Sequence, residues 1–342
     1  MNDDLLVEIK DLRLDFHTFD GVSKVLAGID LKMRRGDVLG LVGETGCGKT
    51  MTALSIPRLI PCPPGRIVSG EVFFEGEDVL NKEEEEMRLF RAQKIGMIFQ
   101  DPTTNLNPVF TIGEQMTDII ICREGSSSRA ALAPFGSLVP PARSERMVAR
   151  EKAIEWLNRV GIPDAEKRID HYPHQFSGGM RQRVLIATAL SGNPSLLIAD
   201  EPTTALDVSI QAQILRLIQE LVEEMDLSVL LITHNLGVVA RMCHRVAVMY
   251  AGVVVECADV ISIFQAPKHP YTVGLLRAIP TSRTKRGEIK EIPGSIPNFI
   301  HPPPGCRFHP RCEYAMPRCA KEPPPGTKEI EPGHEVACFL YS

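Results

Sequence analysis

A glycine-rich segment near the N-terminus has the residue types and spacing of a phosphate-binding loop. Residues 43–50 read Gly-Glu-Thr-Gly-Cys-Gly-Lys-Thr, a complete G-x-x-x-x-G-K-T pattern. The glycines let backbone N–H groups turn toward phosphate oxygens, and the following helix N-terminus adds positive potential. Lys49 would reach the β- and γ-phosphates, and the Thr50 hydroxyl would bind Mg²⁺. The residues predicted to bind a nucleoside triphosphate are Gly43, Glu44, Thr45, Gly46, Cys47, Gly48, Lys49, Thr50 and Met51.

The segments on either side of this loop agree with that prediction. Residues 38–42 form an apolar run that predicts a buried strand, and a helix-compatible stretch begins near Met51. Because the glycine pattern also occurs by chance, this strand–loop–helix context matters. Cys47 has no obvious base among its neighbours, so we interpret it as a small loop residue rather than a nucleophile.

The composition is that of an ordinary globular chain. It has 342 residues, 44% of them hydrophobic, and a formal net charge of -5. This length is sufficient for one large domain and a smaller additional segment. The chain has no excess of basic residues that would indicate a nucleic-acid partner. The acidic N-terminus does not resemble a signal peptide, and no apolar run approaches the roughly 18 residues that a membrane span requires. We therefore expect a cytosolic protein that associates with a membrane only through partners.

A second glycine-rich segment opens a predicted helix. Residues 176–183 read Phe-Ser-Gly-Gly-Met-Arg-Gln-Arg, and apolar residues follow. Ser177 is a natural N-cap, and Gly178 and Gly179 expose backbone N–H groups at the positive end of the helix. A serine-capped turn without a ligand is the alternative. Two anion sites so far apart in one chain favour a shared ligand.

Two adjacent carboxylates follow the apolar strand predicted for residues 195–199. Asp200 can hold Mg²⁺ through its water shell, and Glu201 can polarise an attacking water. Because side chains alternate along a strand, the two should point to opposite sides, which suits separate roles.

The order of these motifs resembles that of the ATP-binding cassette (ABC) superfamily. Residues 177–182 look like its signature motif, and residues 195–201 look like its Walker B strand. The resemblance implies an α/β fold: a P-loop NTPase nucleotide-binding domain with a RecA-like core, an antiparallel β-subdomain and a helical subdomain at about 101–190. We place this domain at residues 1–265, with a Ser-, Ala- and Pro-rich insertion near 123–146.

The resemblance also assigns roles to residues outside these motifs. Gln100 becomes the Q-loop residue, which contacts Mg²⁺ and water, and His234 becomes the switch residue at the γ-phosphate. The remaining residues expected at the nucleotide or at the seam between two cassettes are Ser177, Gly178, Gly179, Gln182 and Asp207. Asn235 stands where the family often carries Asp. An aromatic ring near the first strands should stack on adenine; we favour Phe19, with Phe16 as the alternative.

The C-terminal segment, residues 266–342, points to a branch of the family. His-Pro-Tyr-Thr-Val-Gly-Leu-Leu-Arg-Ala-Ile-Pro at 269–280 resembles a segment of ATPase subunits of oligopeptide, dipeptide and nickel importers, and Ile-Pro-Gly-Ser-Ile-Pro follows at 292–297. Peptides are the expected cargo, and nickel or another small solute is the alternative. The resemblance implies a second ATPase subunit, a paralogue in a heterodimer, two transmembrane permeases and an extracytoplasmic solute-binding protein. The chain would then lie peripherally on the cytoplasmic face of the inner membrane.

Four cysteines of this Pro-rich segment have the spacing C-x5-C-x6-C-x18-C. Four thiolates can ligate a [4Fe–4S] cluster or a tetrahedral Zn²⁺. The short C-x2-C pairs of zinc ribbons are missing, and related importer ATPases carry an iron–sulfur cluster in this region. We therefore predict the cluster, with zinc and free thiols as alternatives, at Cys306, Cys312, Cys319 and Cys338.

Hydrolysis in this family requires two cassettes docked head to tail. A lone cassette holds its phosphate loop and signature on faces too far apart to close on one ATP, so each Mg-ATP is expected between Lys49 of one subunit and the signature of the other. A soluble ABC ATPase acting on ribosomes or DNA is the alternative, since it shares every nucleotide motif. Such proteins usually carry two cassettes or a long coiled-coil insertion, and neither is visible in this sequence.

Overall fold

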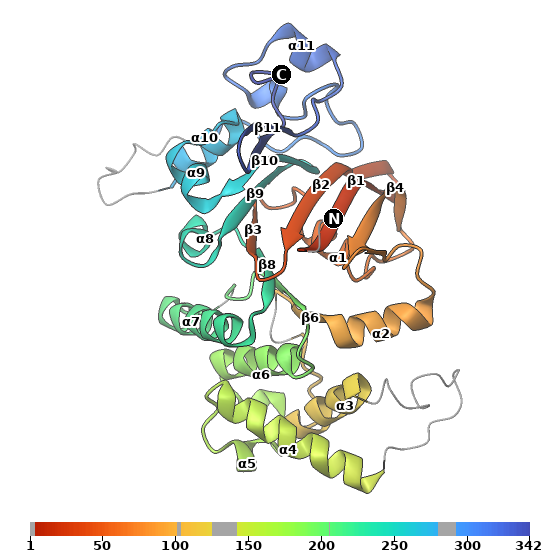
Figure 1. Cartoon of the computed structure of the whole chain (residues 1–342), viewed down its shortest axis with the longest axis vertical. Coiled ribbons are helices and arrows are strands. Elements are labelled where there is room, and N and C mark those ends of the chain that lie inside the picture. The colour runs from red at the N-terminus through yellow and green to blue at the C-terminus, as the bar shows by residue number, and fades with distance from the viewer. Residues whose placement is uncertain (1–3, 101–103, 125–141, 205, 280–291) are drawn as a thin grey trace. The chain divides into compact units, whose positions relative to one another are not determined.

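The computed structural model describes the chain except residues 1–3, 101–103, 125–141, 205 and 280–291 (Figure 1). Most of the predicted insertion near 123–146 therefore lies outside the described residues. The chain divides into two compact units. The first comprises Met1–Asn81 and Leu230–Ser342, and the second comprises Lys82–Val229.

The first unit contains the antiparallel sheet that the sequence predicts. Its strands have the order β2-β1-β4-β5, and each neighbouring pair is antiparallel. Alternate side chains of the long strands are buried, as expected for a sheet with one face on the core. The strands are β1 (Leu5–Thr18), β2 (Gly21–Arg34), β4 (Gly65–Phe74) and β5 (Glu77–Asp78).

A second, mixed sheet of this unit carries the phosphate loop. Its strands that lie wholly or partly in this unit have the order β11-β12-β10-β9-β3-β8, with β3 parallel to β9 and with β10 antiparallel to both β9 and β12. Every residue of β3 and β8 is buried, which is typical of strands covered on both faces. The strands are β3 (Val38–Val42), β8 (Ser228–Ile232), β9 (Arg245–Tyr250), β10 (Val253–Asp259), β11 (Lys328–Glu331) and β12 (His334–Val336).

The helices of the first unit are short. They are α1 (Lys49–Ser55), α8 (Leu236–Met242), α9 (Val260–Gln265), α10 (Pro270–Arg277), α11 (Pro317–Lys321) and the 3-10 turn η3 (His309–Arg311). The C-terminal residues belong to the same compact unit as the N-terminal strands. A separate Cys-rich domain, predicted for residues 266–342, is therefore not confirmed, and the domain boundary at residue 265 stays a prediction.

The second unit is mainly helical. The parallel strands β6 (Ile95–Ile98) and β7 (Leu196–Asp200) pair directly, so their carboxyl ends lie at the same edge. The remaining elements are α2 (Glu84–Lys94), α3 (Ile112–Glu124), α4 (Arg143–Arg159), α5 (Ala165–Arg168), η2 (Pro173–Gln175), α6 (Gly178–Leu190) and α7 (Val208–Met225). No helix in the described part of the chain is both long enough and apolar enough to cross a membrane.

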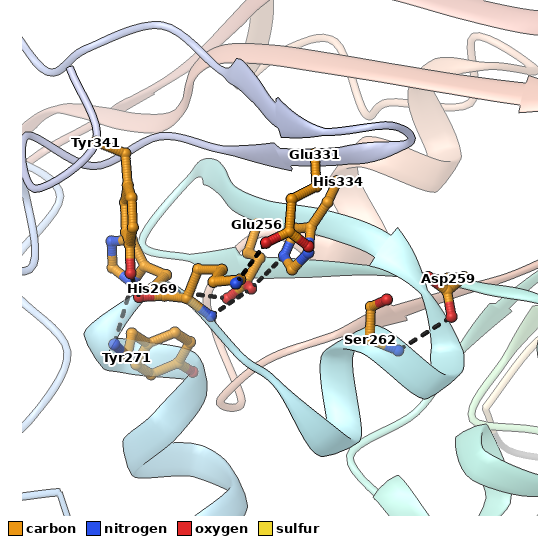
Figure 2. Close-up of polar contacts among 9 residues, drawn as sticks. Glu256, Asp259, Ser262, His269, Tyr271, Glu331, His334 and Tyr341 are labelled. Carbon is orange, nitrogen blue, oxygen red and sulfur yellow. Dashed lines mark hydrogen bonds and ion pairs between the residues drawn. The ribbon is translucent and has the colours of Figure 1, made fainter.

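A buried carboxylate attaches the C-terminal strands to the rest of the first unit. Glu256, on β10, is fully buried and accepts hydrogen bonds from the backbone N–H groups of Lys268 (2.7 Å) and His269 (2.9 Å). Its other contact is with His334 of β12, 2.7 Å from Nε2 to Oε1 (Figure 2). Glu256 therefore holds both the turn before α10 and the C-terminal hairpin of β11 and β12.

The turn that begins α10 is fixed by a neutral histidine. His269 occupies the N-cap position, and its Nδ1 accepts a hydrogen bond from the backbone N–H of Tyr271 at 3.0 Å (Figure 2). Burial lowers the pKa of His269 to about 3, so the ring stays neutral and can accept this bond. The position of Tyr271 is therefore set by the anchor at Glu256.

Replacing Glu256 should destabilise the first unit. Glu256→Ala leaves the N–H groups of Lys268 and His269 and the ring of His334 without a buried acceptor, so we expect a loss of about 3 kcal/mol or more. The measurement is urea unfolding followed by circular dichroism. Glu331→Ala is the control, because its pair with Lys268 is exposed and should contribute little. Equal midpoints for the two variants would contradict this account of the anchor.

Candidate functional site

The phosphate loop connects the end of β3 to the start of α1, as the sequence predicts. Gly43 and Gly48 have φ angles of 155° and 107°, in the region that favours glycine. A side chain at Gly43 would also collide with the backbone oxygen of Met249 on β9. The loop is therefore held tightly against the mixed sheet, and glycine is required by both conformation and space.

Lys49 folds back over its own loop. Its Nζ donates hydrogen bonds to the backbone oxygens of Gly43 (2.8 Å) and Glu44 (3.0 Å), and the residue is 6% exposed. The ammonium therefore has a fixed place above the loop, while Thr45 and Gly46 at the tip are exposed. Cys47 is fully buried, and burial raises the pKa of its thiol. A neutral buried thiol agrees with our interpretation of Cys47 as a small loop residue rather than a nucleophile.

Two C-terminal residues that sequence reasoning missed contact this loop. The backbone N–H of Glu44 donates to the hydroxyl of Tyr271 at 3.0 Å, and Nη1 of Arg311 lies 3.0 Å from Oε2 of Glu44. These partners are 227 and 267 residues away in the chain, so no local pattern could reveal them. The motif at 269–280, which resembles importer ATPases, contains Tyr271. It singles out this segment as important, but it does not indicate which residue Tyr271 contacts.

The switch residues also lie in the first unit. His234 is exposed just after β8, the strand next to β3 in the mixed sheet. Asn235 caps α8, and its Oδ1 accepts hydrogen bonds from the N–H groups of Gly237 (3.0 Å) and Val238 (3.4 Å). Asn and Asp serve equally well at an N-cap, so the departure from the family's usual Asp preserves the local structure.

In the second unit, the predicted water-polarising carboxylate is oriented by two neighbours. Nε2 of Gln100 donates to Oε2 of Glu201 at 3.1 Å, and the hydroxyl of Thr204 donates to the same oxygen at 2.8 Å. Gln100 and Glu201 meet because they follow the parallel strands β6 and β7. Asp200, the last residue of β7, is only 5% exposed, whereas Glu201 is half-buried. The different burial of the two carboxylates agrees with separate roles.

The signature segment begins α6 with the predicted cap. Oγ of Ser177 accepts a hydrogen bond from the backbone N–H of Met180 at 3.3 Å, and Ser177 and Gly178 are exposed. Gln182 is 1% exposed in the interior of this unit. Its predicted role at the nucleotide or at the seam between two cassettes stays a prediction. Asp207 is exposed directly before α7.

The two candidate adenine-stacking rings differ in exposure. Phe19 lies in the turn between β1 and β2 and is fully exposed, whereas Phe16 is partly buried near Gly65. Exposure leaves Phe19 available to a ligand, and its stacking role stays a prediction.

The predicted metal centre of the C-terminal segment is wrong. Cys306, Cys312, Cys319 and Cys338 line one cavity, but its volume is only about 20 Å³, room for about one water molecule. No group of three or more His, Cys, Asp or Glu side chains is placed to hold a metal ion in the part of the chain that the structure describes, which includes all four cysteines. The structure therefore supports neither the [4Fe–4S] cluster nor zinc.

The four cysteines are better described as free thiols packed among apolar groups. Their cavity is also lined by Phe308, Phe339 and Leu340. Burial raises the pKa of Cys306 and Cys312, and raises that of Cys338 to about 11. Burial in apolar surroundings disfavours the charged thiolate, which accounts for these raised values.

Two family profiles match the chain. Residues 26–204 match the family described as ABC transporter, and residues 255–319 match the oligopeptide/dipeptide transporter C-terminal region. The probable peptide ABC transporter ATP-binding protein y4tR of Sinorhizobium fredii is 47% identical over 337 residues, which cover 98% of this chain and 95% of that protein. The oligopeptide transport ATP-binding protein OppD of Bacillus subtilis is 46% identical over 336 residues, covering 98% and 88% respectively.

A solved structure shows the same fold. It is the ATP-binding cassette MJ0796, described as a dimer in a post-hydrolysis state bound to ADP and Pi. It matches with a TM-score of 0.61 and 28% identity, over 74% of this chain and 98% of that one. Together with the phosphate loop, the capped signature helix and the oriented Glu201, these matches show that the chain belongs to the ABC transporter family.

Proposed function

We propose that this chain is the ATP-hydrolysing subunit of an ABC importer that takes up peptides. The observation that carries the proposal is similarity over 98% of the chain to ATP-binding proteins named for peptide and oligopeptide transport. The match of residues 255–319 to the oligopeptide/dipeptide transporter C-terminal region supports a peptide cargo over nickel or another small solute.

The phosphate loop supplies the groups that bind the triphosphate. Backbone N–H groups of the exposed loop tip and the Lys49 ammonium bind phosphate oxygens, since both are donors in a tightly held loop. We infer that Mg²⁺ is held by Thr50, Gln100 and Asp200. The ion, when bound, neutralises charge on the β- and γ-phosphate oxygens.

Glu201 is the group that polarises the attacking water. Gln100 and Thr204 both donate to its Oε2, which fixes the orientation of the carboxylate that polarises the water. His234 follows β8 and contacts the γ-phosphate. Ser177, Gly178 and Gly179 offer the N-terminus of α6 to the phosphates bound by a second subunit.

The chain works as one half of a cassette dimer. Each Mg-ATP binds between the phosphate loop of one subunit and the signature of the other, and hydrolysis reopens the dimer. The second ATPase is a paralogous subunit in this proposal. Two permeases and an extracytoplasmic solute-binding protein complete the importer, and the pair of ATPases lies on the cytoplasmic face of the membrane.

Glu201→Gln should block hydrolysis while sparing nucleotide binding. The substitution removes the carboxylate that polarises water, so we expect turnover to fall by about 10²- to 10⁴-fold in the assembled importer. The measurements are phosphate release and equilibrium binding of Mg-ATP. Glu220→Gln, an exposed position on α7, is the matched control. Wild-type turnover in the Glu201 variant would refute the assigned role.

Lys49→Ala should weaken nucleotide binding itself. Loss of the ammonium removes charge-assisted hydrogen bonds to phosphate, so we expect the Kd for Mg-ATP to rise by about tenfold to a hundredfold. Titration with Mg-ATP in a calorimeter measures the change. Lys32→Ala, an exposed lysine of β2, should bind like the wild type. An unchanged Kd for Lys49→Ala would show that the loop does not bind phosphate as proposed.

A further inference from the structure

Three groups of Glu44 make hydrogen bonds or ion pairs: one contacts Lys49 within the phosphate loop, and two contact the C-terminal segment. Its backbone oxygen accepts a hydrogen bond from Nζ of Lys49 at 3.0 Å, and its backbone N–H donates to Tyr271 at 3.0 Å. Its carboxylate pairs with Arg311 at 3.0 Å. One residue therefore contacts both the phosphate-binding lysine and two side chains from the far end of the chain.

Arg311 is itself held rigidly. Its Nε donates to the backbone oxygen of Pro293 at 2.8 Å, and its Nη2 donates to that of Ile292 at 3.2 Å. Its Nη1 also lies 3.4 Å from the hydroxyl of Tyr250, and the side chain is 8% exposed. Because a planar guanidinium bonded on several sides has little freedom left, the carboxylate of Glu44 meets a fixed partner.

An aromatic cluster supports both contacts to Glu44. The ring centroids of Tyr250 and Tyr271 are 4.7 Å apart, and Phe308 packs edge-on to both at 5.0 and 5.4 Å. Tyr271 lies in the first turn of α10, directly after the turn that Glu256 holds (Figure 2). Tyr250 of β9, Tyr271 of α10 and Phe308, the residue before η3, thus pack together beside the groups that contact Glu44.

We propose that Arg311 is a positioning residue for ATP binding: paired with Glu44 and assisted by Tyr271, it holds the phosphate loop in the conformation that places Lys49. Arg311 also neutralises a carboxylate that belongs to the loop and would otherwise repel the triphosphate. The C-terminal segment in this way contributes directly to nucleotide affinity. The inference rests on the proposed role of the loop in ATP binding and is independent of the cargo.

The test is a double-mutant cycle on the affinity for Mg-ATP. Arg311→Met removes the charge and keeps most of the side-chain volume, and we expect the Kd for Mg-ATP, and with it KM, to rise by about threefold to tenfold. The kcat at saturating ATP should change less than KM, because Glu201 and Gln100 are untouched. Combining Arg311→Met with Glu44→Gln should weaken binding no more than Arg311→Met alone, since both changes break the same pair.

Controls separate this inference from a general loss of structure. Arg318→Met is the same substitution in the same segment, but its ion pair is with Glu322, is exposed and does not involve the phosphate loop, so binding should match the wild type. Tyr271→Phe keeps the packed ring and removes only the hydroxyl that accepts from Glu44, and should raise the Kd in the same direction. Thermal unfolding of each variant checks that the first unit remains folded.

The outcomes distinguish this inference from the proposed function. If Lys49→Ala weakens binding while Arg311→Met and Tyr271→Phe bind like the wild type, the positioning role is overturned and the ATPase assignment stands. If the Arg311 and Glu44 effects multiply in the double variant, the pair does not act as a unit and the inference fails. If Lys49→Ala has no effect, the proposed function itself fails.

Discussion

The position of the Lys49 ammonium depends on the backbone of its own loop. Two carbonyl oxygens, of Gly43 and Glu44, accept hydrogen bonds from Nζ, so any movement of those two residues also moves the charge that meets the phosphates. Packing limits that movement at Gly43, which lies against Met249. At Glu44 the limit comes from hydrogen bonds to Tyr271 and Arg311. The chemistry of a short local motif is thus supported by residues that lie more than 200 positions further along the chain.

Much of the site could be predicted from the sequence because its parts are local. The strand at 38–42, the loop that follows it and the cap at Ser177 depend on neighbouring residues, and the structure has each of them. The meeting of Gln100 with Glu201 was implied by the family resemblance. It has a simple physical basis, since both residues follow parallel strands that are paired in register.

The predictions that failed or were missed depend on contacts distant in the sequence. The contacts of Glu44 link residues more than 200 positions apart, a relation that no spacing rule encodes. The four cysteines do gather in space, but around an apolar cavity of about 20 Å³, so proximity did not imply ligation.

The discontinuous make-up of the first unit has a consequence for how the chain folds during synthesis. Residues 82–229 are continuous, so this whole unit is synthesised before the second part of the first unit, Leu230–Ser342. Strand β3 emerges long before β9, its parallel partner, and every residue of β3 is buried in the finished sheet. Strand β3 therefore cannot pair with β9 until more than 200 further residues have been made. The nucleotide loop attached to it can complete its contacts only after Arg311, the last partner of Glu44, has been synthesised.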